Sequence, residues 1–202
     1  MQYLSAAEYV TFGLGEDTAD ELVVAASAMI DAFCRRTSLA VTQYVERVRL
    51  RRGCEAQLSF LPIAAENGAL SALVSVRARI GRAAMNVSPM ADVLCAFGLA
   101  GQWVDVDVST VTVSADGVLV LTPHLFGVPY VEAEVTYTSG YVDVPVPVKI
   151  ACAQIVKNAQ AMPALNVKRQ AMDGMKMEYF QGALLDAEVQ RLLQPYVAER
   201  VG

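Results

Sequence analysis

Apolar residues near the N-terminus recur at the spacing of an amphipathic helix. Two stretches match the capping-box pattern, in which a hydroxyl residue is followed three positions later by Glu: Ser5 with Glu8, and Thr18 with Glu21. The pattern predicts a short helix after Ser5 and a longer helix from Thr18 to about residue 36. The core-facing stripe predicted for the longer helix consists of Leu22, Ala25, Ala26, Met29, Ile30 and Phe33.

From about Thr42 the spacing changes from helical to alternating, which predicts strands. Val48 and Leu50 alternate with arginines, and the Asp116–Gly117 pair is a strong hairpin signal between two later strands. Further alternating stretches are residues 56–60, 70–80, 103–108, 111–113, 118–121 and 132–137. The middle of the chain, residues 42–141, is therefore predicted to be an antiparallel β region.

Helical spacing returns after Tyr141. Pro147 suits the first turn of a helix, where its missing amide proton costs nothing. Ala151, Ile155 and Ala159 fall on one face of that helix, which should reach about residue 162. Asp186 is a good cap for a last helix with an apolar stripe, and Pro195 should break or kink that helix near residue 194.

The order of these elements predicts an α+β fold. We expect a helical bundle from the N- and C-terminal segments, with an inserted antiparallel β region and an extended C-terminal arm. The helical core is assigned to residues 1–41 and 142–167, the β region to 42–141, and the arm with its final helix to 168–202. With 202 residues, 54% of them apolar and 18% charged, the chain can bury a substantial core and is unlike a disordered one.

The first residues and the cysteines indicate the cellular compartment of the protein. No basic segment followed by an apolar run opens the chain, so we expect no secretory signal and synthesis in the cytoplasm. The apolar run at residues 22–30 is much too short to span a bilayer. Without a Cys-x-x-Cys pair, and with one histidine, we expect buried free thiols and no metal or cofactor at Cys34, Cys54, Cys95 and Cys152.

Candidate catalytic groups are few. Asp105 and Asp107 lie two positions apart on a predicted strand and should point the same way. They would serve a small hydrolase only if they converged with His124 in a pocket. The sequence has no nucleophile elbow and no phosphate-cradling glycine loop. We therefore expect no catalytic residue and no enzyme, and keep the hydrolase as an alternative.

Arginines are the sharpest charged feature. Seven of them flank two predicted strands: Arg47, Arg49, Arg51, Arg52, Arg77, Arg79 and Arg82. Two interpretations are open. The arginines either pair with carboxylates across neighbouring strands on a solvated face, or contact DNA, an acidic partner or a neighbouring subunit. The formal net charge of −5 argues against non-specific clamping of nucleic acid.

Several motifs, in their order, resemble the head-tail connector, or adaptor, proteins of tailed bacteriophages. Residues 3–5, the two capped helices and residues 34–37 resemble the family's opening helices and their basic exit. Residues 58–63 resemble its strand that ends in a proline and an aliphatic residue. Residues 135–147 with the helix that follows resemble its most recognisable segment, and residues 192–196 its closing motif. The β region is longer than in the smallest members.

The resemblance implies a structural protein of the virion neck. The family forms a ring of about twelve copies that docks under the portal protein, extends the DNA channel and provides the platform for tail attachment. The next neck or tail component binds the other side, and packaged DNA passes through the lumen without sequence-specific binding. A head-closure or tail-completion protein of the neck is the alternative.

The C-terminal arm is expected to make the portal contact, because Met and aromatic side chains fill apolar grooves on a partner. The predicted anchors are Met175, Met177, Tyr179, Phe180, Leu192, Leu193 and Tyr196. A core role for the same residues is the alternative. The candidates for a partner or subunit contact in the β region are Arg47, Arg49, Arg51, Arg77 and Arg79.

Overall fold

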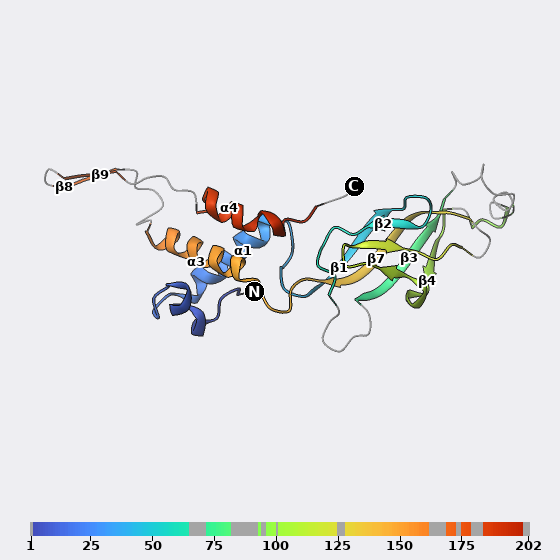
Figure 1. The fold of residues 1–202 in the computed structure, drawn as a ribbon. Helices are drawn as coiled ribbons and strands as arrows, with labels where there is room; N and C mark the ends of the chain where they lie inside the picture. The colour runs from blue at the N-terminus through green and yellow to red at the C-terminus, as the bar shows by residue number, and fades with distance from the viewer. Residues whose placement is uncertain are drawn as a thin grey trace. The chain divides into compact units, whose positions relative to one another are not determined.

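The protein divides into two compact units (Figure 1). A computed structural model describes residues 2–64, 72–81, 93, 96–99, 101–124, 128–161 and 184–199, and the backbone of residues 169–172 and 175–178. The helical unit comprises Met1–Ser38 and Asp143–Val197, and the sheet unit comprises Leu39–Val142 and Ala198–Gly202. The fold is α+β, as predicted, but it is richer in sheet than the expected helical bundle, because the sheet unit carries a core of its own.

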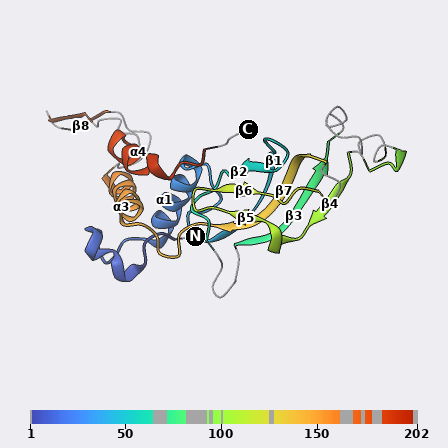
Figure 2. The ribbon, with the colours of Figure 1, turned by 45° about the vertical axis from the view of Figure 1, so that its right-hand side comes forward.

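The helical unit is built around helix α3, Val146–Ala161, which contacts both α1, Asp20–Phe33, and α4, Ala187–Leu193. Figure 2 shows α1 in blue beside α3 in orange. Short 3-10 turns complete the unit: Ala6–Glu8, Val10–Phe12 and Gln194–Tyr196. Buried side chains from all three helices form the core of this unit, among them Ile30, Ile155 and Leu193.

Helix α1 buries a face one residue away from the predicted stripe. Its buried residues are Val23, Ala26, Ser27 and Ile30, whereas Leu22 and Met29 are half-buried and Ala25 is exposed. The difference arises at Ser27, which the apolar pattern counts as a surface residue. The Ser27 hydroxyl donates to the Val23 carbonyl oxygen at 2.7 Å and accepts from the Tyr3 amide at 3.1 Å, so it is buried without an unsatisfied group.

The structure contains the first of the two predicted capping boxes but not the second. At the first, the Ser5 amide donates to Glu8 Oε2 at 3.0 Å, but the turn that follows is a 3-10 helix. At the second, helix α1 begins after Ala19, and Thr18 Oγ1 is buried with no hydrogen-bond partner among the described residues. The predicted second capping box is therefore wrong, although the helix itself is present.

The later helices follow the sequence more closely. Ala151 and Ile155 are buried, as predicted for α3, and Pro147 occupies its second position. Asp186 Oδ1 accepts from the Val189 amide at 2.8 Å, which confirms the predicted cap of α4. The α-helix ends at Leu193, and a 3-10 turn carries Pro195.

Residues 187–193, assigned from the sequence to the arm, instead pack against α3. Val189 and Leu193 are both fully buried, because the apolar stripe of α4 faces the core of the helical unit. Ahead of α4, strands β8, Arg169–Met172, and β9, Met175–Glu178, pair as an antiparallel hairpin.

The sheet unit contains two antiparallel sheets. The larger consists of β1, Thr42–Arg49, β7, Tyr130–Ser139, β3, Leu73–Ile80, and β4, Trp103–Val106, in the order β1-β7-β3-β4 (Figures 1 and 2). The smaller consists of β2, Glu55–Gln57, β6, Val118–Val120, and β5, Thr112–Val113, in the order β2-β6-β5. A 3-10 turn, Val108–Thr110, follows β4. Apolar side chains from both sheets form one core, whose most buried members include Leu58, Ile80, Leu119, Leu121, Val135 and Tyr137.

Two glycines hold turns that a larger residue would disturb. Gly117, with φ +82°, closes the predicted hairpin between β5 and β6. Gly140 lies where the two ends of the segment Leu39–Val142 meet: Ala40 and Tyr141 form a parallel bridge, and the Tyr141 amide donates to the Leu39 carbonyl oxygen at 2.8 Å. A Cβ at Gly140 would lie 2.4 Å from the Ala40 carbonyl oxygen, so only glycine allows this approach.

Candidate functional site

One face of the four-stranded sheet carries a ladder of charges that alternates in sign from strand to strand. Arg47 stands on β1, Glu132 and Glu134 on β7, Arg77 and Arg79 on β3, and Asp105 on β4. The residues share a face because paired residues of an antiparallel sheet point the same way, as do residues two apart on one strand. We call this surface the charged face.

Glu132 is the centre of the charged face. Its Oε1 lies 3.1 Å from Arg79 Nη2, and its Oε2 lies 3.2 Å from Arg47 Nε. The second contact is an ion pair without hydrogen-bond alignment, since Oε2 is buried and accepts no hydrogen bond from a described residue. Both guanidinium groups also lie over the ring of Trp103, at 4.7 Å for Arg47 and 5.9 Å for Arg79.

Trp103 was not singled out by the sequence analysis. It is opposite Arg79 in the pairing of β3 with β4, so only the strand register brings its ring under the arginines. The signal that could have found it is a tryptophan at the start of an alternating stretch that also contains Asp105.

Arg77 completes the paired part of the charged face. Its Nε lies 3.2 Å from Asp105 Oδ1 and its Nη1 lies 3.9 Å from Glu134 Oε1, with all three side chains at least 41% exposed. Arg47, Arg77 and Arg79 thus pair with carboxylates across neighbouring strands, which is the first of the two interpretations of the arginines. Arg49 and Arg51 form no ion pair with any described residue, and Arg82 lies outside the described part of the chain.

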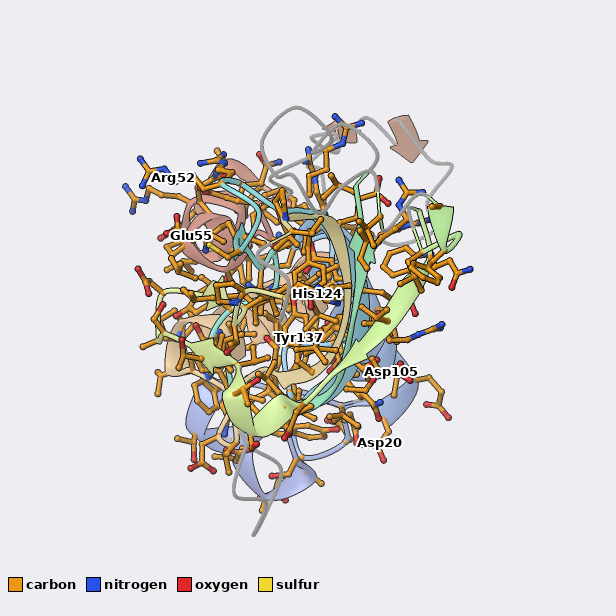
Figure 3. All side chains as sticks on the ribbon, turned by 90° about the vertical axis from the view of Figure 1, so that its right-hand side faces the viewer. Asp20, Arg52, Glu55, Asp105, His124 and Tyr137 are labelled. Carbon is orange, nitrogen blue, oxygen red and sulfur yellow. The ribbon has the colours of Figure 1, made fainter. Side chains whose placement is uncertain are left out.

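The three groups of the hydrolase alternative have separate partners. Asp105 pairs with Arg77, whereas Asp107 caps the 3-10 turn and accepts from the Ser109 amide at 2.9 Å, which lowers the pKa of Asp107. The His124 ring stands edge-on to Tyr130, with 5.9 Å between centroids. Figure 3 shows Asp105 on the side of the four-stranded sheet away from Tyr137. The arrangement offers no carboxylate pair for acid-base chemistry.

Glu46, on the core side of β1, accepts hydrogen bonds from two neighbouring residues. It accepts from the Tyr137 hydroxyl at 2.8 Å, from the Ser59 amide at 3.0 Å and from the Ser59 hydroxyl. Burial, together with the Glu46 charge, raises the pKa of Tyr137 far above its usual range. Tyr137 is fully buried and its hydroxyl also accepts from the Phe60 amide at 3.2 Å, so this network fixes residues 59–60 and offers no access to a substrate.

Two of the three described cysteines are buried free thiols, as expected. Cys34 and Cys152 are fully buried, and burial raises the pKa of each to about 11, which keeps them as unreactive thiols. Cys54 is half-buried, and Cys95 lies outside the described residues. Among the described residues no group of three His, Cys, Asp or Glu side chains could hold a metal ion. No helix in the described part of the chain is long and apolar enough to cross a membrane.

The predicted portal anchors lie in different surroundings in the structure. Leu193 is fully buried within the helical unit and so belongs to its core, while Leu192 and Tyr196 are half-buried. Met175 and Met177 stand on strand β9. Tyr179 and Phe180 lie outside the described residues. Their contact with a portal stays a prediction.

Comparison with solved structures finds chains of gene transfer agent particles. A chain from the neck of an empty particle, computed with C6 symmetry, matches with a TM-score of 0.50 at 15% identity, over 99% of this chain and 92% of that one. A chain from the neck of a native particle, computed with C12 symmetry, gives 0.46 at 14% identity, over 98% and 91%. A chain from the native virion gives 0.48 at 15% identity, over 99% and 92%.

The sequence matches no protein-family model and no curated protein. At 15% identity, the match to the neck chain of the empty particle concerns the fold alone. That fold extends over nearly the whole of both chains, and it agrees with the resemblance to head-tail connector proteins seen in the sequence.

Proposed function

We propose that this protein is a structural subunit of a virion neck. In this proposal it is a head-tail adaptor that forms a ring, docks under the portal protein, extends the DNA channel and provides the platform for tail attachment. Its function is to hold neighbouring components in place, and it catalyses no reaction. Newly made subunits would assemble from the host cytoplasm onto the particle.

The fold shared with a neck chain carries the proposal. The likeness covers 99% of this chain, and therefore both the helical unit and the sheet unit. The order of sequence motifs that resembles the connector family points the same way. Because that neck was computed with C6 symmetry, a ring of copies is the natural assembly to propose, and the family resemblance implies about twelve.

The portal contact is assigned to the β8–β9 hairpin and to the half-buried residues at the end of the helical unit. A two-stranded hairpin alone is marginally stable in water, and an added partner surface would stabilise it. Leu192 and Tyr196 remain candidate contacts, whereas Leu193 is assigned to the core because it is fully buried. Subunit packing is assigned to the half-buried side of α1, which includes Leu22, Met29 and Phe33.

The first test is negative-stain imaging of the purified protein mixed with its cognate portal ring, beside each component alone. A second ring stacked coaxially on the portal is the expected result. Absence of a complex over a range of salt and protein concentration would contradict the adaptor role. Stacking on another neck component but not on the portal would assign the chain to head closure or tail completion.

The hairpin is tested with an internal replacement rather than a truncation. Removing residues 168–202 would also remove Val189 and Leu193 from the core of the helical unit. Replacing residues 169–178 by a Gly-Ser segment of equal length leaves α4 in place, and we expect normal thermal unfolding with loss of portal binding. Arg191→Ser, an exposed change on α4, is the control and should bind normally. Unchanged binding by the hairpin replacement would remove the hairpin from the contact.

A further inference from the structure

The structure separates the arginines of the sheet unit into two groups. Arg47, Arg77 and Arg79 are paired with carboxylates on the charged face. Arg49, Arg51 and Arg52 are all exposed and form no ion pair with any residue that the structure describes. We call the second group, at the turn between β1 and β2, the arginine turn. In the strand register Arg49 stands opposite Glu132, and Arg51 bridges to Glu55, but neither guanidinium group lies within ion-pair distance of a carboxylate of the described residues.

The backbone of the arginine turn is held in place on both sides. The Arg51 and Glu55 backbones exchange hydrogen bonds of 2.6 and 3.0 Å, which close the turn. The Gly53 carbonyl oxygen accepts from the Tyr130 amide at 3.2 Å, and a Cβ at Gly53 would lie 2.4 Å from Pro129 Cβ. The turn is thus packed against the start of β7, so its arginines project from a fixed position.

Arg52 occupies a backbone conformation that arginine rarely adopts. Its φ is +53°, in the left-handed region where Gly and Asn are favoured. Figure 3 shows the Arg52 side chain pointing away from the ribbon, and Glu55 nearby. A residue held in a sparsely populated conformation motivates a search for a role of its side chain.

The chemistry of the turn fits phosphate groups. A guanidinium presents a planar fork of donors that matches phosphate oxygens. Residues two apart on a strand are separated by about 6.6 Å, at roughly 3.3 Å per residue. Arg49 and Arg51 are therefore far enough apart to contact two different phosphate groups of a DNA strand.

A contact with an acidic protein is the competing explanation, and the surroundings of the turn argue against it. Protein interfaces are organised around a buried apolar or aromatic centre. Of the exposed large apolar residues of the described chain none lies within residues 49–57, and Val120, opposite Glu55 in the pairing of β2 with β6, is a single side chain rather than an apolar centre. Contacts with the DNA backbone need no such centre, because they depend on charge.

We propose that the arginine turn is a DNA-backbone contact: Arg49, Arg51 and Arg52 bind phosphate groups of double-stranded DNA without reading its sequence. Each subunit binds weakly, because three phosphate contacts act in a chain whose net charge is −5, and a ring of subunits multiplies the effect. The proposed neck role only explains why DNA is present, so binding in solution tests the turn independently of the ring.

The experiment measures the fluorescence anisotropy of a labelled DNA duplex titrated with the full-length protein at several salt concentrations. For three phosphate contacts, affinity should fall by roughly 80-fold between about 20 and 100 mM salt. The triple variant R49S/R51S/R52S should bind at least about tenfold more weakly at low salt, with most of this salt dependence lost. The control R47S/R77S/R79S has the same net charge and should bind within about twofold of the unchanged protein.

Three outcomes would overturn the proposal. The unchanged protein does not bind DNA at about 20 mM salt, or the two triple variants lose affinity equally, which would indicate net charge alone. In the third outcome the arginine-turn variant binds DNA normally but no longer stacks on the portal, which would assign the turn to a protein partner. Failure to bind DNA together with normal stacking would leave the neck role intact. DNA binding without stacking would leave the arginine turn intact and contradict the adaptor role.

Discussion

The two faces of the four-stranded sheet each hold a glutamate, but with different kinds of partner. On the core side, Glu46 is surrounded by donors from Tyr137 and Ser59, and its contacts are hydrogen bonds from neutral groups. On the solvent side, Glu132 lies between the guanidinium groups of Arg47 and Arg79. One strand, β1, contributes to both arrangements, because Glu46 and Arg47 are adjacent in sequence and point to opposite faces.

The two glutamates should differ in the cost of losing a partner. Removing a donor from Glu46 leaves a half-buried carboxylate short of a partner, next to a core that water does not enter. Removing an arginine from the outer face leaves a carboxylate that water can solvate. The core side should therefore contribute more to stability than the charged face.

The largest expected effect comes from Tyr137→Phe. The change removes one donor to Glu46 and the acceptor of the Phe60 amide, so the free energy of unfolding should fall by about 1.5–3 kcal/mol. Urea unfolding followed by circular dichroism measures it. Tyr130→Phe, on the same strand, removes a hydroxyl with no hydrogen bond to a described residue and should change little. Equal effects of the two changes would contradict a special role for the Glu46 network.

An intermediate case is Glu8 in the helical unit, which pairs with Lys149 and accepts from the Ser5 amide. Its hydrogen bond with Lys149, then those from Ser5, lower the pKa of Glu8 from 4.5 to about 2. Because the folded value lies below the unfolded one, the stabilisation is complete above about pH 4.5 and is lost as the pH falls towards 2.

Glu8→Gln should therefore destabilise the protein at pH 6 and have a shrinking effect as the pH is lowered to about 2. Unfolding curves of both proteins at a series of pH values measure the difference. A gap that stays constant with pH would mean that the hydrogen bonds of residue 8, rather than its charge, carry the stabilisation.

The smallest expected effect is that of Arg77→Ser. Its ion pairs with Asp105 and Glu134 are exposed, so the free energy of unfolding should change by less than about 1 kcal/mol, and less still at high salt. Arg79→Ser should cost more, because Arg79 also lies over the Trp103 ring and pairs with the less exposed Glu132. Thermal melts of both variants would test the order, and a larger loss for Arg77→Ser would reverse it.

The periodicity of the sequence was a good guide where side chains decide the structure locally. The strand from Thr42, the Asp116–Gly117 hairpin and the Asp186 cap are all present, because alternation, turn geometry and capping each involve residues close in sequence. The face of α1 was misjudged at Ser27, whose hydroxyl is satisfied by the Val23 carbonyl oxygen and by the distant Tyr3 amide. The spacing of apolar residues does not predict the burial of a polar residue whose hydroxyl has both a local and a long-range hydrogen bond.

The charged face could be predicted only in outline. Arginines on two strands indicated pairing or a partner, but strand order and register decide that Glu132 receives both Arg47 and Arg79, and that Trp103 joins them. Glu46 did leave a signal, since it lies in phase with the buried Tyr44 and Val48. A carboxylate in an apolar phase indicates a bonded acid on the core side.

The parallel bridge between Ala40 and Tyr141, closed over Gly140, places the two ends of the segment Leu39–Val142 next to each other. A segment whose ends meet adds little loop-closure entropy to the chain that holds it. Domain insertion is tolerated best where the two ends of the inserted segment lie close together. Across related genomes, the sheet unit and the helical unit should therefore diverge in length at different rates, with Leu39 and Val142 marking the ends of the variable segment.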